Sequence, residues 1–209
     1  MRSFKVLRVL LVLAGGLLVG VWRGWVPLPD DWNPWAPLDV RASPNLLTRF
    51  KLGRLQDDPA LCDQVLKTSG LRVTHQADSP VDAACPLAVA FALFERHSLQ
   101  PAAQAVFGQA VTRVDHLGSF ACRNIYNRAD GRLSQHASAN ALDIAGFRLA
   151  DGRTISVLKD WPGDGESARF LRQVRDGACK DFNVVLSPDY NAAHRNHFHL
   201  DMGRWWVCR

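Results

Sequence analysis

Apolar residues recur at helical spacing in the first half of the chain, which predicts helices there. The longest of these begins at Pro101, a first-turn position where the missing N–H leaves no hydrogen bond unmade. Its Val106, Ala110 and Val114 then fall on one face of a helix. We expect helices over residues 61–67, 86–97 and 101–116, and a short strand over 71–76.

The pattern becomes typical of strands after residue 140. Residues 141–149 predict one strand, and Asp151-Gly152 is a turn sequence that favours a hairpin into a second strand over 153–158. Further strands are expected over 182–186 and 197–202.

One more helix is expected over residues 166–176, ending at Gly177, a residue type favoured just after a helix C-terminus. Helices early in the chain and hairpins later indicate an α+β domain. We therefore predict a mostly antiparallel sheet with helices packed on it.

The N-terminus has the pattern of an export signal. Arg2, Lys5 and Arg8 precede an uncharged apolar run over residues 9–22. Because no small-residue cleavage site follows, we interpret residues 1–26 as an uncleaved anchor rather than a cleaved signal or a buried helix. The positive flank then places the rest of the chain outside the cytoplasm, in the periplasm and tethered to the inner membrane.

Four prolines, the first Pro27 and the last Pro37, exclude a regular helix, so residues 27–39 are interpreted as an extended linker. The remaining residues, 40–209, are long enough for one domain with its own core. Hydrophobic residues make up 47% of the chain and charged residues 22%, which is ordinary for a globular protein.

The net charge of +5 suits an anionic partner such as an acidic wall polymer. The basic residues are scattered, with no run of five Lys or Arg and no aromatic-rich RNA-reading motif. Nucleic acid is therefore not expected as a partner.

The chain has five cysteines, none of them in a C-x-x-C motif, which argues against a cysteine zinc ribbon. Behind an export signal, such cysteines are expected to form disulfides. Two bridges with one cysteine left over allow 5 × 3 = 15 patterns, and spacing alone does not choose among them. The alternative is a set of free, buried thiols.

Histidines are concentrated on the last predicted strand. Alternate residues of a strand share a face, so His197, His199 and Asp201 point away from the face that carries Phe198 and Leu200. Imidazole is a common zinc ligand, and two rings on one face can reach the same cavity. His194 lies just upstream, in a segment with the character of a turn.

A second group lies near the predicted strand over residues 141–149. Asp143 is on that strand, and His136 is in the loop before it. Together with one histidine of the last strand they make three ligands and leave a fourth position open, which is the plan of a catalytic zinc site. An alternative uses His136, His197 and His199 as ligands, with Asp143 supporting them.

The other three histidines are interpreted as surface or capping residues: His75, His97 and His116.

The segments SQHASANALDIAGF (134–147) and HRNHFHLD (194–201) together resemble the bacterial extensin-like C-terminal domain family over residues 38–201. That family is related to the LAS zinc metallopeptidases, which include D-Ala-D-Ala carboxypeptidases, murein endopeptidases and the hedgehog signalling domain. The resemblance implies a LAS-like fold. In the LAS motif S-x-H-x-x-G-x-A-x-D, Ala139 replaces the glycine of the family.

The resemblance assigns His136, Asp143 and His199 as zinc ligands. Dipeptidase-type relatives have an acidic base three residues before the last ligand, and Asn196 occupies that position here. The spacing H-x-x-H-x-H instead resembles the murein endopeptidase branch, which implies that His197 is the base.

The resemblance also implies supporting roles. His194 would assist the base or hold substrate, and Arg123 resembles an arginine of the family's first strand that faces substrate. The implied disulfides are Cys62–Cys85 and Cys122–Cys179, with Cys208 left over.

The expected function is that of a periplasmic zinc-dependent hydrolase of peptidoglycan peptide cross-links, in which zinc-bound water attacks the amide. The alternative is a non-catalytic, zinc-containing module that binds the cell wall.

Overall fold

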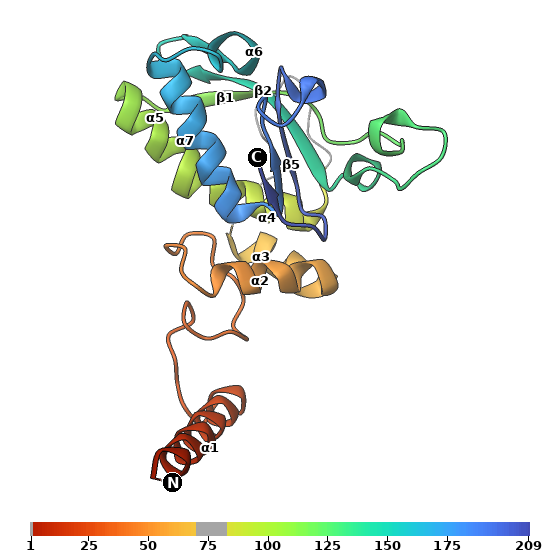
Figure 1. Ribbon diagram of the computed structural model, residues 1–209. Coiled ribbons are helices and arrows are strands. Elements are labelled where there is room, and N and C mark those ends of the chain that lie inside the picture. Colours follow the sequence, from red (N-terminus) through yellow and green to blue (C-terminus); the bar gives the residue numbers. More distant parts are fainter. Residues whose placement is uncertain (1, 70–82) are drawn as a thin grey trace.

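The computed structural model describes residues 2–69 and 83–209, and its domain is α+β (Figure 1). Strands form a mixed sheet in the order β1-β2-β5-β4-β6, with β3 paired to β2. Their bounds are β1 Val111–Gly118, β2 Ala141–Leu149, β3 Thr154–Ser156, β4 Val184–Leu186, β5 Phe198–Asp201 and β6 Val207–Cys208. The prediction of an α+β fold is confirmed.

Four of the five pairings between these strands are antiparallel, and the fifth, between β4 and β6, is parallel. The predicted strand over 141–149 matches β2 and its hairpin partner is β3. That partner is shorter than predicted because helix α6 (Val157–Asp160) begins at once, with the Ser156 hydroxyl accepting from the Lys159 N–H. The strands predicted over 182–186 and 197–202 correspond to β4 and β5.

Among the helices that precede the sheet are α2 (Thr48–Asp57), α3 (Pro59–Ser69) and α4 (Cys85–Phe94). The predicted helices over 61–67 and 86–97 correspond to α3 and α4, and a π-helical turn, η1 (Glu95–Leu99), continues α4. The strand predicted over 71–76 lies outside the described residues.

The helix predicted over 101–116 is wrong in its second half. Helix α5 (Gln100–Phe107) ends at Gly108, whose φ of 65° caps the helix in the left-handed region. The chain then reverses into β1, where β-branched Val111, Thr112 and Val114 favour a strand. Apolar spacing alone did not distinguish the two, because Val111 and Val114 fit either pattern.

Helix α7 (Glu166–Asp181) packs with α4 and α5 on one face of the sheet. Phe170 of α7 meets Phe147 of β2 edge to face, with centroids 5.4 Å apart. The predicted end at Gly177 is wrong, since α7 continues through it. A Cβ at Gly177 would lie 2.5 Å from Ser98 Cβ, so this glycine allows η1 and α7 to approach closely.

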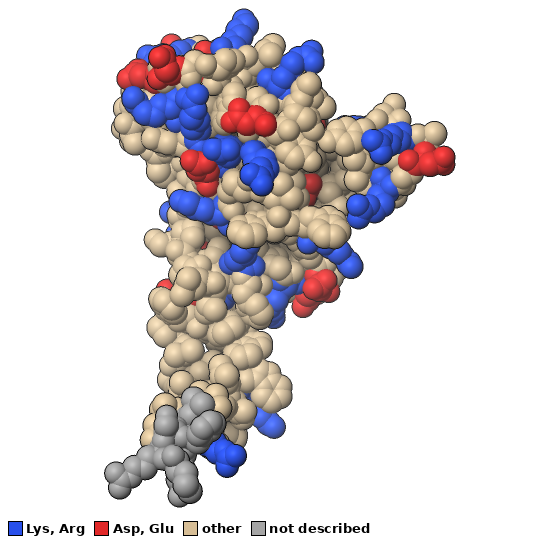
Figure 2. Space-filling view, viewed as in Figure 1, with Lys and Arg blue, Asp and Glu red and all other residues tan. Residues whose placement is uncertain are grey.

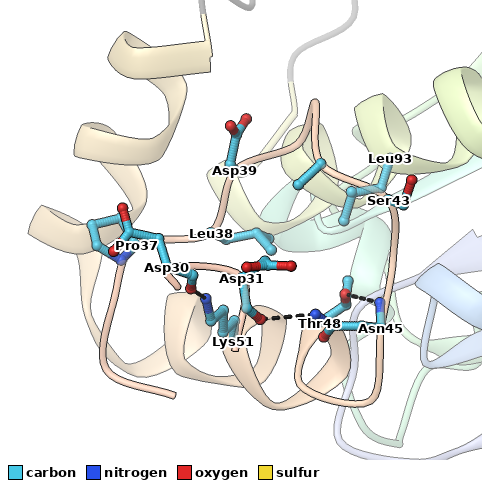
Figure 3. A pocket seen from close by; sticks show the side chains of 11 residues that line it. Asp30, Asp31, Pro37, Leu38, Asp39, Ser43, Asn45, Thr48, Lys51 and Leu93 are labelled. Atoms are coloured by element: carbon cyan, nitrogen blue, oxygen red, sulfur yellow. Dashed lines mark hydrogen bonds between the residues drawn. The ribbon is translucent and has the colours of Figure 1, made fainter. Parts of the chain in front are cut away.

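Residues 27–39 contain no regular helix, as predicted, but this segment is hydrogen-bonded to the domain. Lys51 donates to the Asp30 carbonyl, Asn45 donates to the Asp31 carbonyl, and a pocket forms between these residues (Figure 3). Burial lowers the pKa of Lys51. Leu38 and Val40 are part of the hydrophobic core.

Helix α1 (Arg2–Trp22) lies at the far end of this segment (Figure 1). Within the described part of the chain, no helix combines the length and apolarity needed to cross a membrane.

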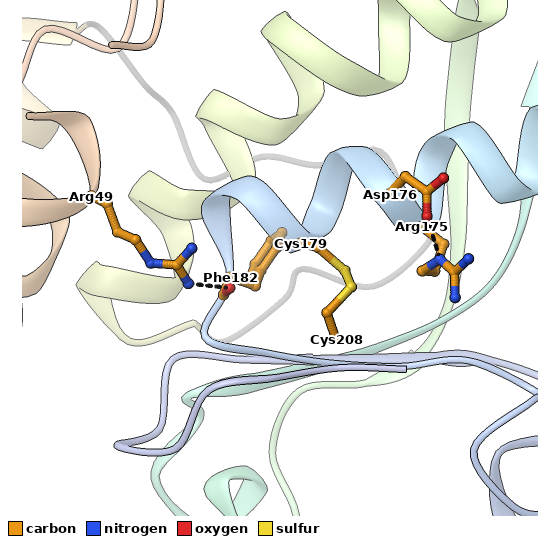
Figure 4. Close-up of a disulfide and its surroundings, with 6 residues drawn as sticks. All are labelled: Arg49, Arg175, Asp176, Cys179, Phe182 and Cys208. Carbon is orange, nitrogen blue, oxygen red and sulfur yellow. Dashed lines mark hydrogen bonds and ion pairs between the residues drawn. A yellow bond between two sulfur atoms is a disulfide. The ribbon is translucent and has the colours of Figure 1, made fainter. Parts of the chain in front are cut away.

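Two disulfides are present among the described residues. Cys62–Cys85 joins α3 to α4, as the resemblance implied. The implied Cys122–Cys179 bridge is wrong, because Cys179 of α7 bonds Cys208 of β6 (Figure 4). Cys122 is an exposed free thiol in the loop after β1. The C-terminal strand places Cys208 beside α7, and the spacing of the cysteines along the sequence did not predict this contact.

Charged side chains of both signs are interspersed over the face of the molecule seen in Figure 2. This agrees with the scatter of Lys and Arg along the sequence.

Candidate metal centre

The three predicted ligands converge on the sheet face opposite α7. Asp143 of β2 and His199 of β5 are directly paired across the antiparallel ladder, so their side chains share a face. His136 comes from a 3-10 turn, η3 (Gln135–Ser138), that leads into β2. One ligand atom from each residue lies within 4.8 Å of the others.

Contacts between these ligand atoms are short. His199 Nδ1 lies 2.9 Å from Asp143 Oδ1, and His136 Nε2 lies 3.2 Å from Asp143 Oδ2. The two ring nitrogens are 3.3 Å apart. Two imidazoles and a carboxylate form a donor set that suits zinc, and a four-coordinate zinc held by them would have one position for a further ligand.

Both ligand rings are held in place by their other nitrogen. His136 Nδ1 lies 3.1 Å from the Ser119 carbonyl, which can only accept, so Nδ1 carries a hydrogen and Nε2 is the ring nitrogen that faces Asp143 and would face a metal. His199 Nε2 lies 2.9 Å from Asp201 Oδ2. A carboxylate behind a metal-binding histidine fixes its tautomer and raises its basicity.

The electrostatics of the cluster favour its charged forms. Burial raises the pKa of Asp143, but hydrogen bonds with His136 and His199 outweigh it and hold that pKa well below its usual range. Burial lowers the pKa of His199, but hydrogen bonds with Asp143 and Asp201 outweigh it and raise that pKa to about 9. Without a metal, His199 therefore carries a proton between two carboxylates, and a bound cation would replace that proton.

The turn that presents His136 is tightly constrained. Ser134 caps it by accepting the His136 N–H, and Ala139 ends it with φ at 53°, in the left-handed region. The carbonyl of Ala139 also accepts from Ala84 N–H, which ties the turn to the start of α4. A non-glycine residue in this conformation costs about 1–2 kcal/mol.

His197 and His194 lie beside the three ligands. Each ring directs Nδ1 to an asparagine carbonyl oxygen: His197 to Asn196 at 2.9 Å and His194 to Asn191 at 2.8 Å. Because the amide oxygen accepts, Nδ1 carries the hydrogen and each Nε2 can accept a proton. His197 Nε2 lies 3.7 Å from Asp143 Oδ1.

Burial lowers the pKa of His197. Burial, together with the neighbouring His197 and His199, lowers the pKa of His194 to about 4.

Arg123 lies in the loop after β1 rather than in a strand, and it lines the same cleft. This cleft has a volume of about 440 Å³. All six predicted site residues line it: Arg123, His136, Asp143, His194, His197 and His199.

Asp201 and Ser119 are contacts that sequence reasoning did not assign. Strand alternation had placed Asp201 on the site face, and this was the available signal for its role. Ser119 is 17 residues from His136 and contributes a backbone oxygen. Any residue type can supply a backbone oxygen, so the sequence could not predict this contact.

The remaining histidines have other environments. His97 lies in η1 and its Nε2 is 3.0 Å from the Val40 carbonyl. His116 lies in β1, and both its ring nitrogens are buried without a hydrogen-bond partner. The prediction of a surface or capping role is therefore wrong for His116. His75 lies outside the described residues.

The fold and the cleft define an α+β domain whose sheet carries a His-Asp-His group able to hold a divalent metal. A family model described as "Extensin-like protein C-terminus" matches residues 52–209. The chain therefore belongs to the extensin-like C-terminal family. The match begins within α2 and includes every residue of the cleft. No curated protein and no solved structure matches the chain.

Proposed function

We propose that this protein is a periplasmic zinc-dependent hydrolase that cleaves peptide cross-links of peptidoglycan, an endopeptidase related to the LAS metallopeptidases. The observation that carries the proposal is the oriented donor set. His136 and His199 turn one nitrogen toward Asp143, and each is fixed from behind, by the Ser119 carbonyl and by Asp201.

Zinc held by His136, Asp143 and His199 would supply Lewis-acid activation of a water molecule and of an amide carbonyl. The chain's own residues then manage protons and substrate. His197 accepts a proton at Nε2, because Asn196 holds its Nδ1–H. The asparagine in place of the acid thus orients a histidine base.

Two further residues would support the base and the substrate. The ring of His194 lies 5.2 Å from that of His197 and restricts its movement. Arg123 lines the cleft, where a guanidinium can bind a carboxylate of a wall peptide in two parallel hydrogen bonds.

The proposed compartment is supported by the two disulfides, which persist in oxidising environments. The proposed tether to the inner membrane uses α1, whose described apolar side chains are largely exposed. Fractionation of cells into periplasm and membrane tests this, and recovery in the cytoplasm would contradict it.

The full-length protein, purified with its disulfides formed, tests the function. Bound zinc is measured, purified sacculi are digested, and released fragments are identified by mass spectrometry. We expect cleaved cross-links with the wild type and none with His136→Ala, which loses zinc. His197→Ala should keep zinc and lose cleavage. Full zinc occupancy without cleavage by the wild type would refute the proposal.

Asn196 favours a second function, a zinc-containing module that binds the wall without cutting it, because no acidic base stands there. Zinc-dependent retention on sacculi without released fragments would support this function.

The choice of ligands is tested separately. With Asp143 as a ligand, Asp143→Ala loses zinc and His197→Ala retains it. The reverse result would favour the His136, His197 and His199 set.

A further inference from the structure

The cleft extends well beyond the candidate metal ligands, along the sheet toward the C-terminal strand. Val184 pairs with Asp201 and Leu186 pairs with His199, so both apolar side chains share the site face. Val207 of β6 pairs with Val184 and also lines the cleft. The sheet therefore continues from the histidines as an apolar floor.

Trp205 stands at the end of this floor and lines the cleft, yet 68% of its surface is exposed. The guanidinium of Arg132, from the loop after β1, lies 5.9 Å from its ring centroid. A cation near an indole ring is attracted to the ring's electrons. Trp205 and Arg132 thus form one corner of the cleft, contributed by segments far apart in sequence.

The charged side chains of the cleft that are not hydrogen-bonded to His199 are cationic. Its acidic residues are Asp143 and Asp201, and both are hydrogen-bonded to His199. Its remaining charged groups are Arg123 and Arg132. An anionic ligand therefore meets no opposing free carboxylate in this part of the cleft.

The openness of the corner distinguishes between ligand types. An apolar side chain is normally held in a pocket that covers most of its surface. A sugar ring instead has a face of C–H groups and a rim of hydroxyls. That shape matches a flat, exposed indole with a hydrogen-bond donor beside it, which describes Trp205 and Arg132.

We propose that Trp205 and Arg132 form a saccharide-side subsite, which takes the sugar ring of a glycan-linked wall peptide on Trp205 and an adjoining carboxylate on Arg132. This rests on the proposed function, since it identifies that substrate as a peptide still attached to its glycan. A free peptide would have no sugar ring to place on Trp205.

Binding is measured calorimetrically with the full-length protein carrying His197→Ala, which removes the proposed base and so prevents turnover. The probes are a soluble disaccharide-peptide and the same peptide with the saccharide removed. We expect the disaccharide-peptide to bind about tenfold more tightly, a contribution typical of one aromatic contact. Equal affinities, or no binding of either probe, would overturn the inference.

The neighbouring tryptophan provides a matched control. Trp206 is similarly exposed, at 69%, but it does not line the cleft, and it contacts Arg49 at 4.7 Å. Trp205→Ala should abolish the preference for the disaccharide-peptide, whereas Trp206→Ala should keep it. A preference that survives Trp205→Ala would also overturn the inference. Zinc content and circular dichroism establish that both variants are folded.

Arg132→Gln separates the carboxylate contact from the sugar contact. It should weaken both probes by a similar factor, since both carry the peptide carboxylates, and unchanged affinities would refute the role of Arg132. Cleavage is scored in a separate assay on the protein with His197 intact. Selective binding without cleavage would refute the peptidase proposal alone, and cleavage without selective binding would refute this inference alone.

Discussion

Asp201 links the metal centre to the backbone around it. One carboxylate oxygen lies 2.9 Å from His199 Nε2, and the other accepts the Gly203 N–H at 2.7 Å. We predict that Asp201→Asn lowers zinc affinity about 10- to 100-fold, the usual effect of losing such a partner. The amide oxygen can still accept from Gly203, so the loop should remain in place. Zinc affinity is measured by competition with a chelator.

A suitable control for this change is Asp160→Asn. Asp160 also accepts a backbone N–H, from Ser156, but it lies outside the cleft. Its zinc affinity should equal that of the wild type. An Asp201→Asn protein with unchanged zinc affinity would show that His199 is not held in this way.

Ala139 has a backbone conformation that glycine adopts more easily, with φ at 53°. We predict that Ala139→Gly stabilises the protein by about 0.5–1 kcal/mol, because relief of the left-handed strain exceeds the entropy that glycine adds to the unfolded chain. Urea unfolding measures the difference. Ala137→Gly, in the same turn, should destabilise by a similar amount, and a destabilising Ala139→Gly would contradict the assignment of strain.

At the scale of elements, the pattern of residues predicted β2, β3, β4 and β5 but assigned β1 to a helix. The bounds of β2 were predicted to the residue because its residues are mostly apolar and an Asp-Gly turn follows it. The helix before β1 was extended too far, since Gly108 was not taken as its end. The parallel β6 was missed because two residues carry no periodicity.

The Cys179–Cys208 disulfide fastens β6 to α7 across 29 residues of sequence. Removing it with Cys179→Ser and Cys208→Ser should cost about 3–4 kcal/mol, the loop-entropy value for this separation. Urea unfolding measures the loss. Cys122→Ser should change stability by less than about 0.5 kcal/mol, because Cys122 is exposed and unbonded.

Thiol titration of the unfolded protein checks the pairing directly. We expect one reactive thiol in the wild type and none in Cys122→Ser. A reactive thiol that persists in Cys122→Ser would show that the pairing is different.

At the scale of the whole molecule, the candidate site could be predicted from the sequence because two short segments carry all three ligands. Strand alternation placed His199 and Asp143 on faces that could meet. The Arg132 and Trp205 side of the cleft could not be predicted from the sequence. These two residues lie close together only because of how a loop and the C-terminal segment fold. No periodic pattern encodes such a meeting.

Metal binding should stabilise the entire domain, because the ligands join η3, β2 and β5. Free zinc at about 100 times its Kd should add about 2.7 kcal/mol, or about 5–10 °C in Tm. Thermal unfolding with zinc or with a chelator measures this. The shift should vanish in His136→Ala, and a shift that persists there would indicate zinc bound elsewhere.

The C-terminal strand also determines how the sheet ends. The Val207 N–H bonds the Asn183 carbonyl, the Arg209 N–H bonds the Val185 carbonyl, and the Ser187 N–H bonds the Arg209 carbonyl. The outward backbone groups of β4 and its flanking residues are therefore occupied by the short C-terminal segment 207–209. At the other end of the described sheet, β1 pairs with repeated register shifts. Neither end offers a long, flat row of free N–H and C=O groups, so the folded domain resists strand-to-strand aggregation with its own copies.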